Sequence, residues 1–198
     1  DSIRQLEYNG NDDAFERKLI NAVCQNIETY IQQISPSHLV YIAFDGVAPV
    51  AKLNQQKNRR YKSWFMADYN KDNSSDNNSK VTSPSTWNST AITPGTEFMN
   101  KLNLQVQYHF RIPTNHNVKQ IIVSGSNLPG EGEHKIFEYI RDNENMLKNM
   151  KTVIYGLDAD LIMLTINHLH VCKEMYLFRE TPDFIRSIDK SLDPNSLY

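Results

Sequence analysis

Apolar residues recur at helical spacing in several parts of the chain. Over Asp13–Ile34 they stand at positions 15, 19, 20, 23, 27, 30, 31 and 34, which predicts an amphipathic helix that Pro36 ends. Another helix is predicted from an N-cap at Thr93, with Pro94 in its first turn. Its apolar face would carry Phe98, Leu102, Val106 and His109. Further helices are expected over residues 52–66 and 182–190.

Short runs of β-branched and aromatic residues alternate with these helices. They predict strands at residues 38–44, 120–124, 152–155 and 174–178. Strands that alternate with helices are typical of an α/β fold, in which a mostly parallel central sheet is covered by helices on both faces. In such folds functional residues gather at the carboxyl ends of the strands.

Composition narrows the class of protein. A chain of 198 residues is most simply one domain, 1–198, and its Asn/Ser-rich stretch at about 70–91 predicts a mobile insert. The net charge of −2 confines any nucleic-acid site to a local patch. Two cysteines without a pairing pattern indicate a reducing compartment, the cytoplasm or alternatively the nucleus. No membrane span or signal peptide is expected, because the apolar runs are only strand-sized and the first residues lack a signal pattern.

Three of the predicted strands lead directly into acidic residues. Asp45 ends the first, Glu131 and Glu133 follow the second, and Asp158 and Asp160 follow the third. If the chain stays extended at Asp158 and Asp160, their side chains point to the same side. Glu131 and Glu133 would diverge by about 200° on a helix. One glutamate is therefore expected to bind metal directly, and the other through water or a second ion.

Such acids have two explanations. Acid pairs after a strand often serve as helix N-caps or first-turn charges that the helix dipole favours. Here three strand ends converge on acids, with no basic residue inside either pair, and carboxylates held together need compensating positive charge. This favours a metal site. Oxygen ligands suit Mg²⁺ or Mn²⁺, and two such ions about 4 Å apart are typical of phosphodiester cleavage.

A basic segment follows Asp45. Between Gly46 and Ala67 the chain carries lysines and arginines but no acid. At helical spacing one face combines Lys52, Gln56, Arg59 and Arg60. This face would bind a terminal phosphate through charge-assisted hydrogen bonds. Alternatively it is a solvated basic surface, but its position directly after Asp45 favours the phosphate pocket.

Five blocks of sequence carry a resemblance to a known family. They are FDGVAPVAKLNQQKNRRYKS at 44–63, ITPGTEFMNKL at 92–102, VSGSNLPGEGEHKIFEYIR at 123–141, YGLDADLIML at 155–164 and FRE at 178–180. On these blocks the chain resembles the Xrn-type 5′→3′ exoribonucleases. The resemblance implies a PIN/flap-nuclease-like fold and a nuclease of RNA decay. Its expected substrate is single-stranded RNA with a 5′ monophosphate, hydrolysed to mononucleotides with the help of two Mg²⁺ or Mn²⁺ ions.

The resemblance also implies roles for individual residues. Metal-binding and catalytic roles fall on Asp45, Glu131, Glu133, Asp158 and Asp160, and the 5′-phosphate pocket on Lys52, Gln56, Arg59 and Arg60. Val50 stands where the family usually has a basic residue, and Lys57 replaces an arginine. Two further family aspartates, one before the first helix and one downstream, have no match here. The chain is therefore expected to be part of a catalytic domain.

Two other functions stay open at this stage. A structure-specific 5′ flap DNA nuclease would share an acid-lined α/β site, although a tight phosphate pocket does not suit branched DNA. An RNA-binding pseudonuclease would keep the phosphate pocket without a complete set of metal ligands. Comparing phosphorylated RNA with flap DNA separates the first alternative, and Mn²⁺ titration separates the second.

Overall fold

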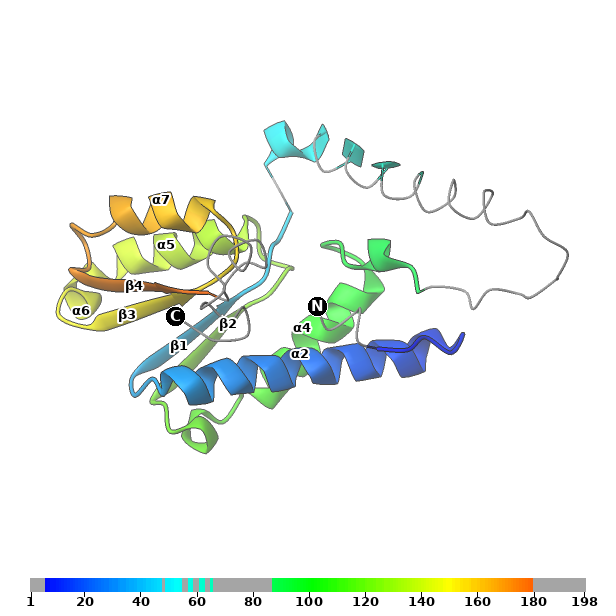
Figure 1. Cartoon of the computed structure of the whole chain (residues 1–198), viewed down its shortest axis with the longest axis horizontal. Helices are drawn as coiled ribbons and strands as arrows, with labels where there is room; N and C mark the ends of the chain where they lie inside the picture. Colours follow the sequence, from blue (N-terminus) through cyan, green and yellow to red (C-terminus); the bar gives the residue numbers. More distant parts are fainter. Residues whose placement is uncertain are drawn as a thin grey trace, which may run out of the picture. The chain divides into compact units, whose positions relative to one another are not determined.

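The computed structural model describes residues 6–47, 49–54, 57–58, 61–62, 65 and 87–179 (Figure 1). The chain divides into two compact units, Asp1–Gly132 (unit 1) and Glu133–Tyr198 (unit 2). Each unit has its own cluster of buried apolar side chains. Among the helices that the structure describes, none is both long enough and apolar enough to cross a lipid bilayer.

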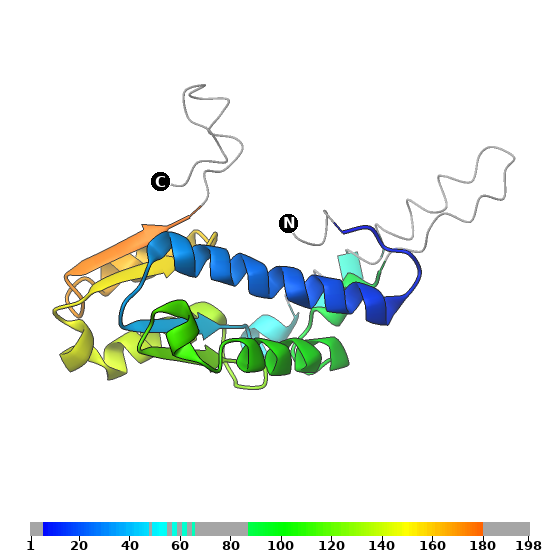
Figure 2. The ribbon, with the colours of Figure 1, turned by 90° about the horizontal axis from the view of Figure 1, so that it is seen from below.

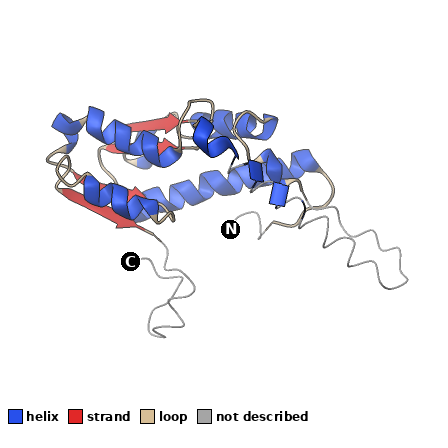
Figure 3. Cartoon of the chain, turned by 90° about the horizontal axis from the view of Figure 1, so that it is seen from above, coloured by secondary structure: helices blue, strands red, loops and turns tan. Residues whose placement is uncertain are grey.

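Unit 1 is built from helices and one parallel pair of strands. Its elements are α2 (Asp12–Ile34), β1 (Leu39–Ala43), the 3₁₀ helix η1 (Ser89–Ala91), α4 (Glu97–His109), the 3₁₀ helix η2 (Pro113–His116) and β2 (Gln120–Ser124). Residues 50–54, 57–58, 61–62 and 65 are also helical, as the sequence predicts for this segment. β1 and β2 are parallel and paired from Leu39↔Gln120 to Ala43↔Ser124 (Figure 3).

The core of unit 1 confirms the predicted apolar faces. Side chains of α2, among them Phe15 and Leu19, are buried together with Phe98, Leu102 and Val106 of α4. Apolar side chains of β1 and β2 pack against this cluster, and α2 lies alongside α4 (Figure 2). His109, also predicted on the buried face, is exposed.

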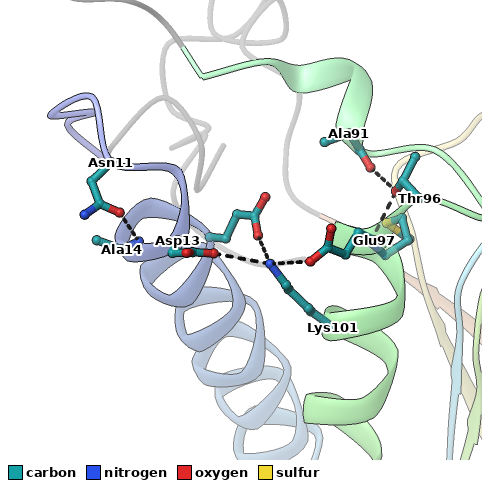
Figure 4. A network of polar contacts seen from close by, with 9 residues as sticks. Asn11, Asp13, Ala14, Ala91, Thr96, Glu97 and Lys101 are labelled. Atoms are coloured by element: carbon teal, nitrogen blue, oxygen red, sulfur yellow. Dashed lines mark hydrogen bonds and ion pairs between the residues drawn. The ribbon is translucent and has the colours of Figure 1, made fainter.

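Polar caps fix where the two long helices begin. The Asn11 side chain accepts a hydrogen bond of 3.0 Å from the Ala14 amide at the start of α2 (Figure 4). The predicted N-cap at Thr93 is wrong, because Thr96 occupies that position and its hydroxyl accepts from the Met99 amide. Residues 93–96 form turns instead of the helix's first turn, so α4 begins three residues later than the Thr93–Pro94 pattern suggests.

An ion-pair network joins these helix starts. Lys101 Nζ lies 3.3 Å from Asp13 Oδ1, 3.0 Å from Glu16 Oε2 and 3.2 Å from Glu97 Oε1 (Figure 4). The hydrogen bond to Glu16, followed by that to Glu97, raises the pKa of Lys101 above the ordinary lysine value. Lys101 therefore stays charged throughout the neutral range and links α4 to the first turn of α2.

The end of the predicted insert belongs to the core. Trp87 is buried, and its ring centroid lies 5.3 Å from that of Phe15 and 5.1 Å from that of Phe98. The prediction of a mobile polar segment is therefore wrong for residues 87–91, since burying a large aromatic ring outweighs the polar composition around it. The remaining part, 70–86, lies outside the described residues.

Unit 2 contains a second parallel strand pair. Its elements are most of α5 (Gly132–Asp142), α6 (Glu144–Leu147), β3 (Lys151–Tyr155), α7 (Asp160–Asn167) and β4 (Glu174–Phe178). β3 and β4 are parallel, paired from Lys151↔Glu174 to Tyr155↔Phe178. Ile154 and Met175 face a core that includes Phe137 and Leu161, whereas Val153 and Tyr176 are exposed. The helices of unit 2 therefore cover one face of its strand pair.

The α/β class with parallel strands is confirmed. In the described part of the chain the strands form two parallel pairs, β1–β2 and β3–β4, where the sequence suggested one central sheet. All four predicted strands are present within one residue of their expected bounds. The helix expected at 182–190 lies outside the described residues, and the prediction of one domain over 1–198 stays a prediction.

Candidate active site

Asp45 is tied to the segment that leads into α5. Its Oδ1 atom accepts a hydrogen bond of 2.6 Å from the Gly132 amide, the first residue of that helix. The Gly46 amide donates to the Gly130 carbonyl over 2.8 Å, and the Gly130 amide donates to the Val47 carbonyl over 3.3 Å. The Gly132 amide stands at the start of α5 and has no hydrogen-bond acceptor within that helix, so the Asp45 carboxylate supplies one. The negative charge of Asp45 also suits the positive end of the helix dipole. The end of β1 and residues 130–132 form one connected corner of unit 1.

Two glycines make this corner feasible. A Cβ atom on Gly46 would lie 1.7 Å from the Leu128 carbonyl oxygen, so only glycine allows the two backbones to approach. Gly130 has φ of 95°, in the region where side chains are strained. Both glycines lie within the sequence blocks that carry the family resemblance, where no role was assigned to them. The DG and PGEG patterns were the signal that could have identified this close approach.

Replacing Gly46 by alanine is expected to lower the free energy of unfolding by about 3 kcal/mol, because the new methyl group meets fixed backbone atoms of Leu128. The variant should also shift Asp45 from the Gly132 amide. Thermal unfolding measures the first effect, and hydrogen exchange of residues 128–136 measures the second. Val47→Ala, at the exposed neighbouring residue, is the control. Equal stability of the two variants would contradict the packing argument.

Glu131 connects the acidic corner to the basic helix. Its Oε2 atom lies 2.8 Å from Nζ of Lys52. The glutamate side chain is 14% exposed and the lysine side chain 46% exposed, so this ion pair is only partly screened by solvent. A predicted metal ligand and a predicted phosphate-binding residue are thus in direct contact within unit 1.

The four residues 131–134 also bring ligand atoms together. One ligand atom from each of Glu131, Glu133 and His134 lies within 4.8 Å of the others. The assumption that both glutamates stand on a helix is wrong, because α5 begins at Gly132 and Glu131 precedes it. The 200° divergence therefore does not apply, and local backbone alone places the two carboxylates close together. His134, with 62% of its side chain exposed, joins this group, which the sequence analysis did not propose.

Asp158 and Asp160 are arranged differently from the prediction. The chain does not stay extended: Ala159 has helical backbone angles and Asp160 is the first residue of α7. The Asp158 Oδ1 atom accepts a 3.0 Å hydrogen bond from the Asp160 amide, which turns the chain into the helix. Both side chains are exposed. Asp158 therefore has the capping role considered for such acid pairs, in addition to any role in metal binding.

The predicted phosphate pocket is described only in part. Lys52 lies in a helical stretch, whereas Gln56, Arg59 and Arg60 lie outside the described residues. Val50, at the start of this helical stretch, is 82% exposed. The acids of the predicted site come from both units, and their convergence stays a prediction.

His168, in contrast, has a structural role. It is buried against Phe137, and its Nδ1 atom lies 2.7 Å from the Leu164 carbonyl oxygen. Its Nε2 atom lies 2.9 Å from Nη1 of Arg141. Since arginine only donates and a carbonyl only accepts, the ring is the neutral tautomer protonated at Nδ1. Both ring nitrogens of His168 are therefore occupied by contacts within unit 2.

Comparisons with known proteins agree with the sequence blocks. The family described as "XRN 5'-3' exonuclease N-terminus" matches residues 3–181. The chain is 37% identical over 205 residues to 5'-3' exoribonuclease 1 of Saccharomyces cerevisiae, covering 96% of this chain and 13% of that protein. It is 36% identical to 5'-3' exoribonuclease 2 of Aspergillus fumigatus, over 85% of this chain and 18% of the relative. It is 35% identical to human 5'-3' exoribonuclease 1, over 82% of this chain and 10% of that protein. The chain thus spans a small part of these relatives.

Proposed function

This chain belongs to the XRN 5′–3′ exonuclease family, and on that premise we propose that its protein is a divalent-metal-dependent 5′→3′ exoribonuclease. The substrate we propose is single-stranded RNA with a 5′ monophosphate, released as mononucleotides during RNA decay. The observation that carries the proposal is the direct contact of Glu131 with Lys52 beside the Asp45–Gly132 bond. Asp45 and Glu131, which suit metal binding, and Lys52, which suits phosphate binding, thus lie together beyond the end of β1.

The donor atoms suit hard divalent cations. One carboxylate oxygen of Glu131 lies within 4.8 Å of one carboxylate oxygen of Glu133. Oxygen donors favour Mg²⁺ or Mn²⁺ over softer metals. We propose Asp45, Glu131, Glu133, Asp158 and Asp160 as the ligands of two ions. Bound ions of this kind lower the pKa of attacking water and stabilise the leaving oxygen.

The residues of the chain would contribute binding and orientation. The hydrogen bond from the Gly132 amide orients the Asp45 carboxylate before a cation binds. Lys52, with Gln56, Arg59 and Arg60, would bind the 5′ phosphate through charge-assisted hydrogen bonds. A cap or a triphosphate would exceed the space of such a pocket, and a 5′ hydroxyl would lose these bonds. The expected result is selection for monophosphorylated ends.

The decisive experiment uses the full-length protein with Mg²⁺ and RNAs that differ only at the 5′ end. Faster degradation of the monophosphate than of the hydroxyl, triphosphate or capped form is expected. Preference for 5′ flap DNA would identify the flap nuclease instead. RNA binding without Mn²⁺ binding in calorimetry would identify a pseudonuclease. Fluorescence microscopy tests the proposed cytoplasmic location against the nuclear alternative.

Lys52→Met is expected to reduce the preference for 5′ monophosphate over 5′ hydroxyl by about tenfold, because one charge-assisted bond to the phosphate is lost. The preference is measured as the ratio of kcat/KM for the two RNAs. This ratio cancels any loss of metal affinity caused by releasing Glu131. Lys62→Met, an exposed lysine on the flank of the same basic segment, is the charge-matched control. An unchanged ratio for Lys52→Met would show that this lysine is only part of a solvated face.

A further inference from the structure

The loop that carries Asp158 is held by the end of β4. The ladder between β3 and β4 closes with the pair Tyr155↔Phe178. One residue further, the Gly156 amide donates a 3.3 Å hydrogen bond to the Phe178 carbonyl. At the next residue a side-chain hydrogen bond follows the backbone pairing, because Nη2 of Arg179 donates to the Leu157 carbonyl over 3.0 Å. The two residues before Asp158 are thus tied to Phe178, the last residue of β4, and to Arg179, which follows it.

The Arg179 side chain is partly buried. Its Nε atom is buried and has no hydrogen-bond partner among the residues that the structure describes. Burying this donor without a partner costs free energy, which the bond of Nη2 to the Leu157 carbonyl partly offsets. The guanidinium brings a permanent positive charge to the peptide group next to Asp158.

The rest of the loop is short and closely packed. A Cβ atom on Gly156 would lie 2.2 Å from Cδ1 of Leu161, a buried side chain in the first turn of α7. Asp158 itself accepts from the Asp160 amide. The direction of the two carboxylates therefore depends on how the peptide at Leu157 is held, and the Arg179 bond is the contact that holds its carbonyl.

We propose that Arg179 is a positioning residue for the Asp158/Asp160 pair, acting through the Leu157 carbonyl and not by touching substrate. This inference rests on the proposed function, in which both aspartates bind metal. Residues that orient metal ligands from outside typically change metal affinity by 10- to 100-fold when they are replaced. Loss of Arg179 should therefore weaken metal binding and lower kcat, while KM for RNA stays unchanged.

Three substitutions in the full-length protein separate the contributions of this side chain. Arg179→Met removes both charge and donor. Arg179→Gln stays polar but is too short to reach the carbonyl in the same way. Arg179→Lys keeps the charge, a similar length and one donor. We expect at least a tenfold weaker Mn²⁺ affinity by calorimetry for the Met and Gln variants, and recovery to within about threefold for Lys.

Arg141→Met is the matched control, since that arginine also donates a hydrogen bond in unit 2 but to His168. It is expected to lower thermal stability only, with Mn²⁺ affinity unchanged. If Arg179→Met does not fold, Arg179→Gln alone decides. Wild-type Mn²⁺ affinity in the Met or Gln variant would overturn the inference, as would a loss that Lys does not restore. In parallel, Asp158→Asn must weaken Mn²⁺ binding. If it does not, the proposed function fails, and the inference fails with it.

Discussion

Replacing Asp158 and Asp160 together by asparagine in the full-length protein is expected to reduce RNA cleavage by at least about 10³-fold, with RNA binding unchanged. This loss corresponds to about 4 kcal/mol of activation free energy. Asparagine keeps a side-chain oxygen at position 158, which can still accept from the Asp160 amide. The turn into α7 should therefore survive, and only the two negative charges are lost.

The experiment measures single-turnover cleavage of 5′-monophosphorylated RNA, RNA affinity without added metal, and Mn²⁺ affinity. The control is Glu144→Gln, which removes an exposed first-turn acid from another helix of unit 2. It should leave cleavage unchanged. If the double variant cleaves RNA at the normal rate and melts earlier, the two aspartates serve only as helix caps. Unchanged cleavage with unchanged stability would exclude both roles.

The second large effect is expected at Asp45, where two substitutions distinguish structure from chemistry. Asp45→Asn keeps an oxygen that can accept from the Gly132 amide, whereas Asp45→Ala removes it. Both should lower cleavage by about 10³-fold, because both remove a proposed ligand charge. Only the alanine variant should also destabilise the start of α5, by about 1–3 kcal/mol for a lost charge-assisted hydrogen bond.

Hydrogen exchange of residues 128–136 reports the structural part of this prediction. Faster exchange at the Gly132 amide is expected for Asp45→Ala and normal exchange for Asp45→Asn. Mn²⁺ affinity should fall in both variants. An asparagine variant with full activity would reduce Asp45 to a cap for α5 and remove it from the set of ligands.

Several local features could be predicted because they depend on neighbouring residues. The β2 strand has the bounds that its β-branched run indicates, and α2 begins one residue before the predicted position. Trp87 shows where composition misleads, since a polar neighbourhood concealed an aromatic ring that packs on Phe15. Asp158 shows the limit of strand periodicity. A single hydrogen bond to the Asp160 amide turned the chain where alternation predicted an extended backbone.

The sequence by itself determined the helices and strands, the acids after three strands, the basic segment after Asp45, and the family. These properties are encoded in spacing over a few residues, or in motifs that are read directly. Only the tertiary structure decided which groups meet. Glu131 and Lys52 are 79 positions apart, and the close approach of Gly46 to Leu128 depends on how two loops pack. Contacts between distant segments arise from register and packing, which no local pattern specifies. For the same reason the hold of Arg179 on the Leu157 carbonyl became visible only in three dimensions.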